Sequence, residues 1–191
     1  LIGVRGIGAF FGFGLMALAS RLDPRVSLTI AFSLQGLSGL YMASFNIDMT
    51  FSQVAWAGII QGIGVGMAWV PISVLTFSTL DKRYFGEGTA MYHLIRNVAS
   101  SFFISITVAV VLHTGQISFG NLSSLVTDWN MGLALNFTDQ FIENFDQVTI
   151  KNLTSEVNRQ SLMIGYINSF MLFAIVSFLT IPLLFLIKKK K

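Results

Sequence analysis

Runs of residues without charge alternate with short charged segments along this chain. A helix needs about 20 mostly apolar residues to cross a bilayer. Four of the runs reach that length, and the first does so if Arg5 is included and its helix begins before Leu1. Helices are expected because backbone groups in lipid must pair internally, and the alternating pattern of a barrel is missing. The predicted transmembrane helices lie near residues 1–20, 26–45, 52–79, 88–112 and 161–187.

Composition supports the same fold class. Hydrophobic residues make up 53% of the 191 residues and charged residues only 11%, and the mean hydropathy is +0.70. A soluble domain carries about 25% charged residues, so this chain has too few to cover a surface that faces water. The chain has no Cys, which excludes disulfide frameworks, thiolate metal sites and cysteine nucleophiles. We predict an all-α integral membrane protein without a cofactor or metal.

The net charge of +3 does not indicate a nucleic-acid partner, because the cations follow the membrane pattern. Four of the twelve end the chain as Lys188 to Lys191, and four of the other eight lie in short loops between apolar runs. Cations gather in alternate loops, as they do in cytoplasmic loops of multi-pass proteins. The pattern predicts a multi-pass protein of the inner (plasma) membrane with a cytoplasmic C-terminus. Since Leu1 stands inside an apolar run, we expect the sequence to be the C-terminal piece of a longer protein.

The fourth connection, residues 113–160, is then expected outside the cytoplasm. It is polar and acidic, and several of its apolar residues share one helical face, which predicts a short surface helix within residues 137–148. That helix is interpreted either as a cap on the bundle or as a lid or partner site. Glycosylation sequons at Asn121, Asn136 and Asn152 matter only in a source that glycosylates.

Polar residues form a stripe on the fourth predicted helix. At about 100° per residue they fall within an arc of roughly 100°. Arg96 lies roughly 14 Å from the start of this helix, near the middle of the bilayer. Ionisable residues at such depth usually face the bundle interior or a watery cavity. Arg96 is therefore a candidate contact for substrate, or a structural Arg bonded to carbonyl groups of neighbouring helices. The stripe consists of Thr89, His93, Arg96, Asn97, Ser100 and Thr107.

Other polar residues of the spans are weaker candidates for the cavity. Histidine is the residue type whose pKa in solution is near neutrality, so His93 is a candidate proton carrier or a packing residue. Arg5, roughly 22 Å from the cytoplasmic end of the first helix, either contacts the cavity or snorkels to the interface. Gln61 and Trp69 are the polar-tipped candidates on the third helix. No predicted span contains Asp or Glu, so coupling carboxylates are expected elsewhere in the protein.

Small residues recur every four positions on two helices. Gly58, Gly62 and Gly66 do so on the third helix, and Gly8 and Gly12 on the first. This spacing allows helices to approach closely, and we interpret it as a packing signal. Gly62, Gly64 and Gly66 are no nucleotide-binding fingerprint, because no strand precedes them and no ribose-binding acid follows.

Two further features of the loops and helices bear on conformational change. Pro71 removes a backbone hydrogen bond and should bend the third helix, as a moving gate or as a static kink. Asp23 and Arg25 form a tight turn with Pro24, either as a topology signal or as a charge clamp that locks one conformer. An enzyme is disfavoured because the sequence has no metal-protease motif, nucleophile elbow or paired membrane carboxylates.

Several motifs in this order resemble one transporter family. They are Arg21-Leu-Asp-Pro-Arg25, Gln61-Gly-Ile-Gly-Val-Gly through Pro71, Leu80-Asp-Lys-Arg, Gly86-Glu-Gly-Thr-Ala, Arg96-Asn-Val-Ala-Ser-Ser and Gln160-Ser-Leu-Met-Ile-Gly. In order and spacing they resemble the fourteen-helix drug:proton antiporters of the major facilitator superfamily, of the EmrB/QacA type. The resemblance covers nearly the whole chain, with residues 113–160 the least specific part.

The resemblance implies a fold, a function and partners. The five helices would form most of the C-terminal six-helix bundle of a major facilitator fold, and the first, third and fourth would line the central cavity. The family exports amphipathic drugs or lipophilic compounds in exchange for protons, and a periplasmic membrane-fusion protein serves its EmrB-like members. The expected partners are membrane lipid and the N-terminal transmembrane bundle of the same protein. The alternatives are a facilitator for a siderophore, lipid or organic anion, and a truncated membrane protein that transports nothing.

Overall fold

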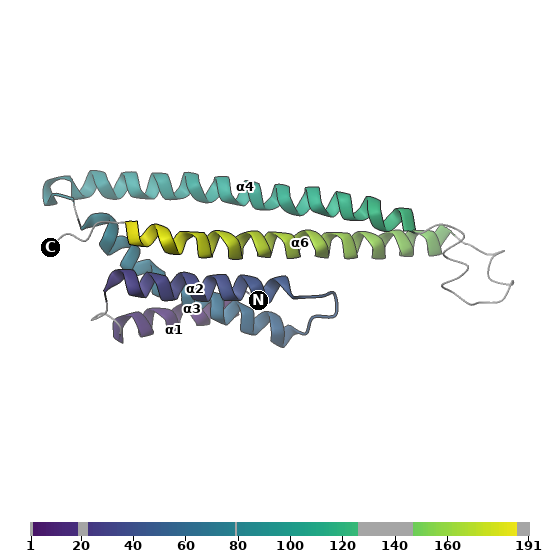
Figure 1. The fold of residues 1–191 in the computed structure, drawn as a ribbon, viewed down its shortest axis with the longest axis horizontal. Coiled ribbons are helices and arrows are strands. Elements are labelled where there is room, and N and C mark those ends of the chain that lie inside the picture. The colour runs from purple at the N-terminus through teal and green to yellow at the C-terminus, as the bar shows by residue number, and fades with distance from the viewer. Residues whose placement is uncertain (1, 19–22, 79, 126–146, 187–191) are drawn as a thin grey trace. The chain divides into compact units, whose positions relative to one another are not determined.

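The described residues of the chain are helical apart from short turns (Figure 1). A computed structural model describes residues 2–18, 23–78, 80–125 and 147–186. No strand occurs among these residues, which confirms the all-α prediction. The elements are α1 (Ile2–Leu18), α2 (Pro24–Ala43), α3 (Phe51–Phe77), the 3₁₀ turn η2 (Lys82–Tyr84), α4 (Phe85–Leu125) and α6 (Gln147–Leu186).

Four of the five long helices are long and apolar enough to cross a membrane. They are α2, α3, α4 and α6, as predicted. The apolar part of α1, Gly3–Ala17, is shorter than a usual span, so its passage through the membrane stays a prediction. The described part of the chain therefore has the helix content of a membrane bundle.

The ends of α2 and α3 follow from local sequence. Pro24 occupies the first turn of α2 directly after Asp23, where its fixed φ suits a helix and its missing N–H is not needed. At the start of α3, the Gln53 side chain accepts a hydrogen bond of 2.9 Å from the backbone N–H of Thr50, as in half of a capping box. Both helices lie within two residues of the predicted 26–45 and 52–79.

Two predicted boundaries, the end of the fourth helix and the start of the fifth, differ from the helices of the structure. α4 has 41 residues and continues 13 residues past position 112, and α6 has 40 residues and begins 14 residues before position 161. The structure thus assigns to helices both ends of the expected loop 113–160. Hydropathy locates the part of a helix that contacts lipid, but a polar segment without a helix-breaking Pro can continue the helix, and residues 113–125 contain no Pro. The expected surface helix lies largely outside the described residues.

The chain divides into two compact units, to which α4 and α6 both contribute. The first unit comprises residues 1–105 and 170–191, and the second comprises residues 106–169. In the first unit α1 and α2 both pack against α3 (Figure 1). Its buried core consists of Leu28, Ala31, Met67, Ala68 and Leu184.

Glycine backbones form the contact between α1 and α3. A β-carbon at Gly62 would overlap the carbonyl oxygen of Arg5, and one at Gly66 would overlap that of Ala9. Seen from α1, a β-carbon at Gly8 would overlap the Ile59 carbonyl oxygen. Only glycine fits these positions, because each helix backbone touches the other directly. Gly58 is looser, since a β-carbon added there would lie 4.0 Å from its nearest neighbour, the backbone N of Arg5.

α2 is fixed to its neighbours by a different set of small residues. Ser38 Oγ is buried and donates a hydrogen bond of 2.9 Å to the Ala57 carbonyl oxygen of α3. A β-carbon at Gly64 would lie 2.9 Å from the Ala31 carbonyl oxygen. On the other side of α2, Gly36 lies under the ring of Phe178 from α6. α3 therefore contacts α1 through Gly62 and Gly66, and it contacts α2 through Gly64.

The second unit repeats close packing of small residues. A β-carbon at Gly165 of α6 would approach the Val111 carbonyl oxygen of α4 too closely. Ser161 and Ser169, one turn before and after Gly165, are buried at 1% and 6% exposure. Small residues at every fourth position of α6 thus let the two helices approach closely within this unit.

Candidate functional site

A pocket of about 220 Å³ lies in the first unit where residues of α2, α3 and α4 meet. Half of its lining residues are apolar, and the others carry an amide, a phenol, an indole and a guanidinium group. A pocket that combines apolar side chains with a few converging polar groups is typical of small-molecule sites. The lining residues are Phe32, Gln35, Val65, Ala68, Trp69, Ile72, Tyr92 and Arg96.

Arg96 and Trp69, two residues predicted separately as cavity candidates, are in contact in this pocket. The guanidinium carbon of Arg96 lies 4.0 Å from the centre of the Trp69 ring. Such a cation–π contact contributes about 0.5–2 kcal/mol, and Trp is the best partner for it. The salt bridge between Arg159 and Glu156 does not involve Arg96, and no carboxylate is found paired with Arg96 in the described part of the chain. The sequence did not indicate that an aromatic ring would accompany this charge.

Trp69 lies on an exposed part of α3, close to Pro71. Pro71 is buried within the helix and has no N–H, so it gives no hydrogen bond to the carbonyl group of Met67. One turn beyond Trp69, Ser73 Oγ donates a hydrogen bond of 3.1 Å to the Trp69 carbonyl oxygen. Trp69 is 43% exposed, whereas Ala68 beside it is buried at 5%. The ring therefore extends from the open face of α3 toward α4.

The polar stripe of α4 is largely exposed in the first unit. His93, Arg96, Asn97 and Ser100 are exposed, and Thr89 is half-buried. The hydroxyl of Thr89 donates to the Phe85 carbonyl oxygen at 2.7 Å, and that of Ser100 to the Asn97 carbonyl oxygen at 2.9 Å. These two hydroxyls are thus satisfied by their own helix. Thr107, the last member, is half-buried and lies in the second unit.

His93 lies beside the pocket and does not line it. Its ring contacts Tyr92, a lining residue, edge to face with a centroid distance of 5.4 Å. Tyr92 in turn packs against Phe77 of α3 at 5.6 Å. His93 is therefore one residue removed from the pocket on the same helix.

The remaining candidates lie outside the pocket. Gln61 is half-buried on α3 and Arg5 is exposed on α1, and neither lines the pocket. Asp23 is exposed before α2, and Arg25 is half-buried in its first turn. The Arg25 carbonyl oxygen accepts a hydrogen bond of 2.9 Å from Thr29 Oγ1. The charge clamp stays a prediction, and Arg21 of the same turn lies outside the described residues.

Sequence reasoning missed several lining residues. Gln35 and Phe32 belong to α2, a helix that the resemblance assigned to no cavity role, and Tyr92 lies at the edge of the polar stripe. Gln35 carried a usable signal, because it is an amide in the middle of an apolar helix. In the described ranges, no group of three His, Asp or Glu residues is placed to hold a metal ion.

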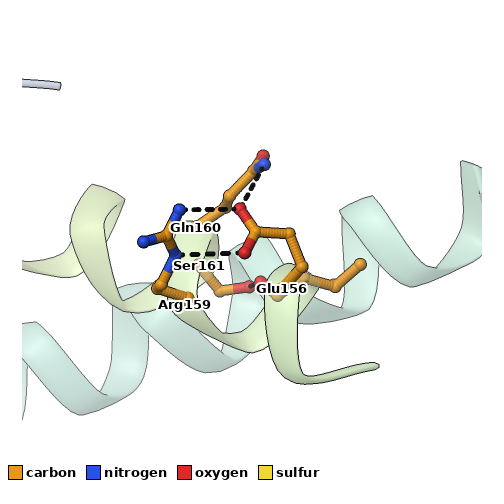
Figure 2. Close-up of polar contacts among 5 residues, drawn as sticks. Glu156, Arg159, Gln160 and Ser161 are labelled. Atoms are coloured by element: carbon orange, nitrogen blue, oxygen red, sulfur yellow. Dashed lines mark hydrogen bonds and ion pairs between the residues drawn. The ribbon is translucent and has the colours of Figure 1, made fainter. Parts of the chain in front are cut away.

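A second polar cluster lies on α6 within the second unit (Figure 2). Arg159 Nε and Nη2 donate to the two carboxylate oxygens of Glu156 at 3.1 and 3.2 Å, and Gln160 donates to the same group at 3.2 Å. These residues precede the charge-free apolar run of α6, so we place them outside the membrane-spanning part. The hydrogen bond from Arg159, followed by that from Gln160, lowers the pKa of Glu156 below its ordinary value. Here an Arg is paired with a carboxylate in water, in contrast to Arg96.

Comparison with known proteins finds distant relatives among bacterial exporters. The multidrug export protein EmrB of Haemophilus influenzae is 24% identical over 149 residues, which cover 76% of this chain and 29% of the relative. The fatty acid resistance protein FarB of Neisseria gonorrhoeae is 20% identical, covering 88% of this chain and 34% of the relative. The colistin resistance protein EmrB of Acinetobacter baumannii is 25% identical, covering 93% and 36%.

These matches concern part of each relative. The chain spans about a third of the length of the curated relatives it matches. No family model matches the chain, and no solved structure matches it. The relatives are named for export and resistance, and they are transporters and not enzymes.

Proposed function

We propose that this chain, a distant homologue of the EmrB and FarB exporters of the major facilitator superfamily, is part of a secondary transporter. The transporter would export amphipathic drugs or lipophilic compounds in exchange for protons by alternating access. This chain would supply most of the C-terminal bundle, and an N-terminal bundle of the same protein would complete the cavity.

The observation that carries the proposal is the exposed polar face of α4 next to the pocket at Arg96. A charged side chain in a membrane span is costly unless it faces protein or water. Residues His93, Asn97 and Ser100 leave this face polar and uncovered within the first unit. A second bundle across a watery cavity would give these groups the polar surroundings that lipid lacks.

The pocket residues have properties that suit an amphipathic substrate. Phe32, Val65 and Ile72 would contact its apolar body, and burying that body is favourable by about 25 cal/mol per Å². Gln35 and the guanidinium of Arg96 offer hydrogen bonds to a polar end. Because no Asp or Glu lies in the predicted spans, the proton-carrying carboxylates would belong to the N-terminal bundle, with His93 as the candidate in this part.

The proposed setting follows from the charges of the loops. The transporter would lie in the inner (plasma) membrane with its C-terminus in the cytoplasm. The ends of α4 and α6 beyond the membrane would then face the periplasm or the outside. A membrane-fusion protein is a candidate partner on that side.

The proposal is tested by efflux from cells or vesicles that contain the whole transporter. We expect Arg96→Ala to reduce drug efflux about tenfold or more, because a charged hydrogen-bonding group is lost from the site. Arg159→Ala is the matched control, since that Arg is exposed on α6 and paired with Glu156; efflux should stay near the wild-type rate. Collapse of the proton gradient should stop efflux by the wild type.

If the Arg96→Ala variant exports drug at the wild-type rate, at equal protein level in the membrane, Arg96 does not belong to the substrate site. Efflux that persists without a proton gradient would reject the antiport mechanism.

A further inference from the structure

We infer that Trp69 positions the Arg96 guanidinium so that the pocket selects a planar anionic group, such as a carboxylate, joined to a compact apolar body. The inference rests on the proposed function, since it names the chemistry of the ligand at the same site. The sequence indicated Arg96 and Trp69 only as separate cavity candidates, and it did not indicate that one positions the other.

The geometry of the stacking is the first step of the argument. The guanidinium carbon of Arg96 lies over the Trp69 ring, 4.0 Å from the ring centre. In a flat stack the ring would cover one face of the planar group, whereas all five N–H donors lie in its plane and point outward from its edges. Such a stack would restrain the guanidinium plane and leave the donors available. A carboxylate binds these edges through two parallel hydrogen bonds, a geometry that Arg favours.

The charges around the pocket are the second step. Arg96 is the only lining residue with a formal charge, and the other seven are apolar, aromatic or amide side chains. The guanidinium is permanently charged, and in the described part of the chain no carboxylate pairs with it. A site with one unpaired cation in an apolar wall attracts an anion and repels an ammonium group.

The size and polarity of the pocket are the third step. A volume of about 220 Å³ suits a small ring or a branched alkyl group together with one head group. Phe32, Val65 and Ile72 line the apolar part. Gln35 adds an amide that can donate to a carboxylate oxygen left free by Arg96. The pocket thus combines an anion-binding end with an apolar end.

Binding of three matched probes tests the inference without depending on transport. The probes are 4-tert-butylbenzoate, 4-tert-butylbenzamide and 4-tert-butylbenzylammonium, which share one apolar body and differ in charge. Their Kd values would be measured by equilibrium dialysis on the purified whole transporter in detergent. We expect the benzoate to bind at least tenfold more tightly than the benzamide, and the ammonium to bind most weakly.

Variants of the two residues separate positioning from general packing. Trp69→Leu should weaken benzoate binding about 3- to 10-fold, because the stacked ring is lost, and should change benzamide binding less than about twofold. Trp69→Phe should restore most of the benzoate affinity, since it keeps an aromatic face. Arg96→Lys keeps the charge but loses the fork of donors, and should lower the benzoate preference about tenfold. Val65→Ala, the control, should weaken all three probes by a similar factor.

Defined results overturn the inference. They are equal binding of benzoate and benzamide by the wild type, tightest binding of the ammonium, or no binding of any probe. Equal benzoate affinity in Trp69→Phe and Trp69→Leu would reject the positioning role, provided that both variants unfold at the wild-type temperature. If a variant is unstable, the three wild-type affinities still decide the ligand class. Benzoate binding together with absent drug efflux would reject the proposed function and leave the inference standing.

Discussion

The two faces of α3 differ in how they meet their neighbours. Toward α1, Gly62 and Gly66 bring backbone against backbone, and an added β-carbon would overlap carbonyl oxygens. Toward α4, Trp69 is 43% exposed and meets Arg96 at the edge of a pocket. One face therefore leaves no space for a side chain, and the other holds large side chains around an open volume.

The difference indicates that one face of α3 supports the structure of the first unit, and that the other face contributes to ligand binding. Interfaces of backbone and small side chains have few alternative arrangements, so the contact of α1 with α3 is suited to act as a rigid support. The pocket face instead holds two long side chains, Arg96 and Trp69, and their contact places a charged group beside the open volume. We expect substitutions on the glycine face to change stability, and substitutions on the pocket face to change function.

The largest expected effect on stability is that of Gly62→Ala. The added methyl group would overlap the Arg5 carbonyl oxygen and force α1 away from α3. Overpacking of this kind costs about 1–3 kcal/mol. Thermal unfolding of the purified protein in detergent should show a clear decrease of Tm. Gly58→Ala is the control, because its nearest neighbour on α1 lies at an ordinary contact distance of 4.0 Å; an equal decrease in both variants would contradict the account.

A smaller effect is expected from Ser38→Ala, on the side of α3 that faces α2. The substitution removes the buried hydrogen bond from Ser38 Oγ to the Ala57 carbonyl oxygen. Hydrogen bonds between membrane helices average about 0.6 kcal/mol, so the decrease of Tm should be smaller than for Gly62→Ala. Ser33→Ala, at a half-buried position of the same helix, should change Tm less. A decrease larger than that of Gly62→Ala would reverse the proposed ranking.

The smallest effect concerns the charge pair at Glu156, which contrasts with the unpaired Arg96. Its pKa is lowered by the hydrogen bond from Arg159, so the folded state favours the ionised carboxylate. The stabilisation is present above the pKa of Glu in the unfolded chain, and it is lost as pH falls through the lower pKa of the folded state. In Glu156→Gln this pH-dependent contribution should disappear, while the contribution at neutral pH is small because the pair is exposed.

The check is the Tm of wild type and Glu156→Gln across the acidic range. The difference between the two proteins should shrink as the pH falls. A difference that grows toward acidic pH has the opposite sign and would contradict the assignment of the pair.

Hydropathy predicted the spans of α2 and α3 well, and it predicted the C-terminal end of α4 and the N-terminal end of α6 poorly. An apolar run locates the part of a helix that lies in lipid, and α2 and α3 end within a few residues of the ends of their apolar runs. Residues 113–125 are polar, yet they contain no Pro and continue α4. The backbone has no reason to leave the helix at the point where the side chains become polar.

The site was predictable in part. The polar stripe identified Arg96, and the polar-tipped residues of α3 included Trp69, but the contact between them depends on how two helices pack. Helix periodicity describes one helix at a time, so it gives no register between α3 and α4. Gly64 shows the same limit, because the sequence alone did not indicate that it lies against Ala31 of α2.

The central claim is that the polar stripe of α4 faces water and not lipid, and cysteine labelling tests it most directly. This chain has no Cys, so the labelling of one introduced Cys can be measured without a second thiol in this part of the transporter. Ser100→Cys lies on the stripe, and Phe102→Cys lies two residues away on the opposite side of the helix, at similar depth. Both positions are exposed in the first unit. We predict that a charged, membrane-impermeant thiol reagent labels Ser100→Cys in the intact transporter much faster than Phe102→Cys. Equal labelling, or faster labelling of Phe102→Cys, would contradict the account.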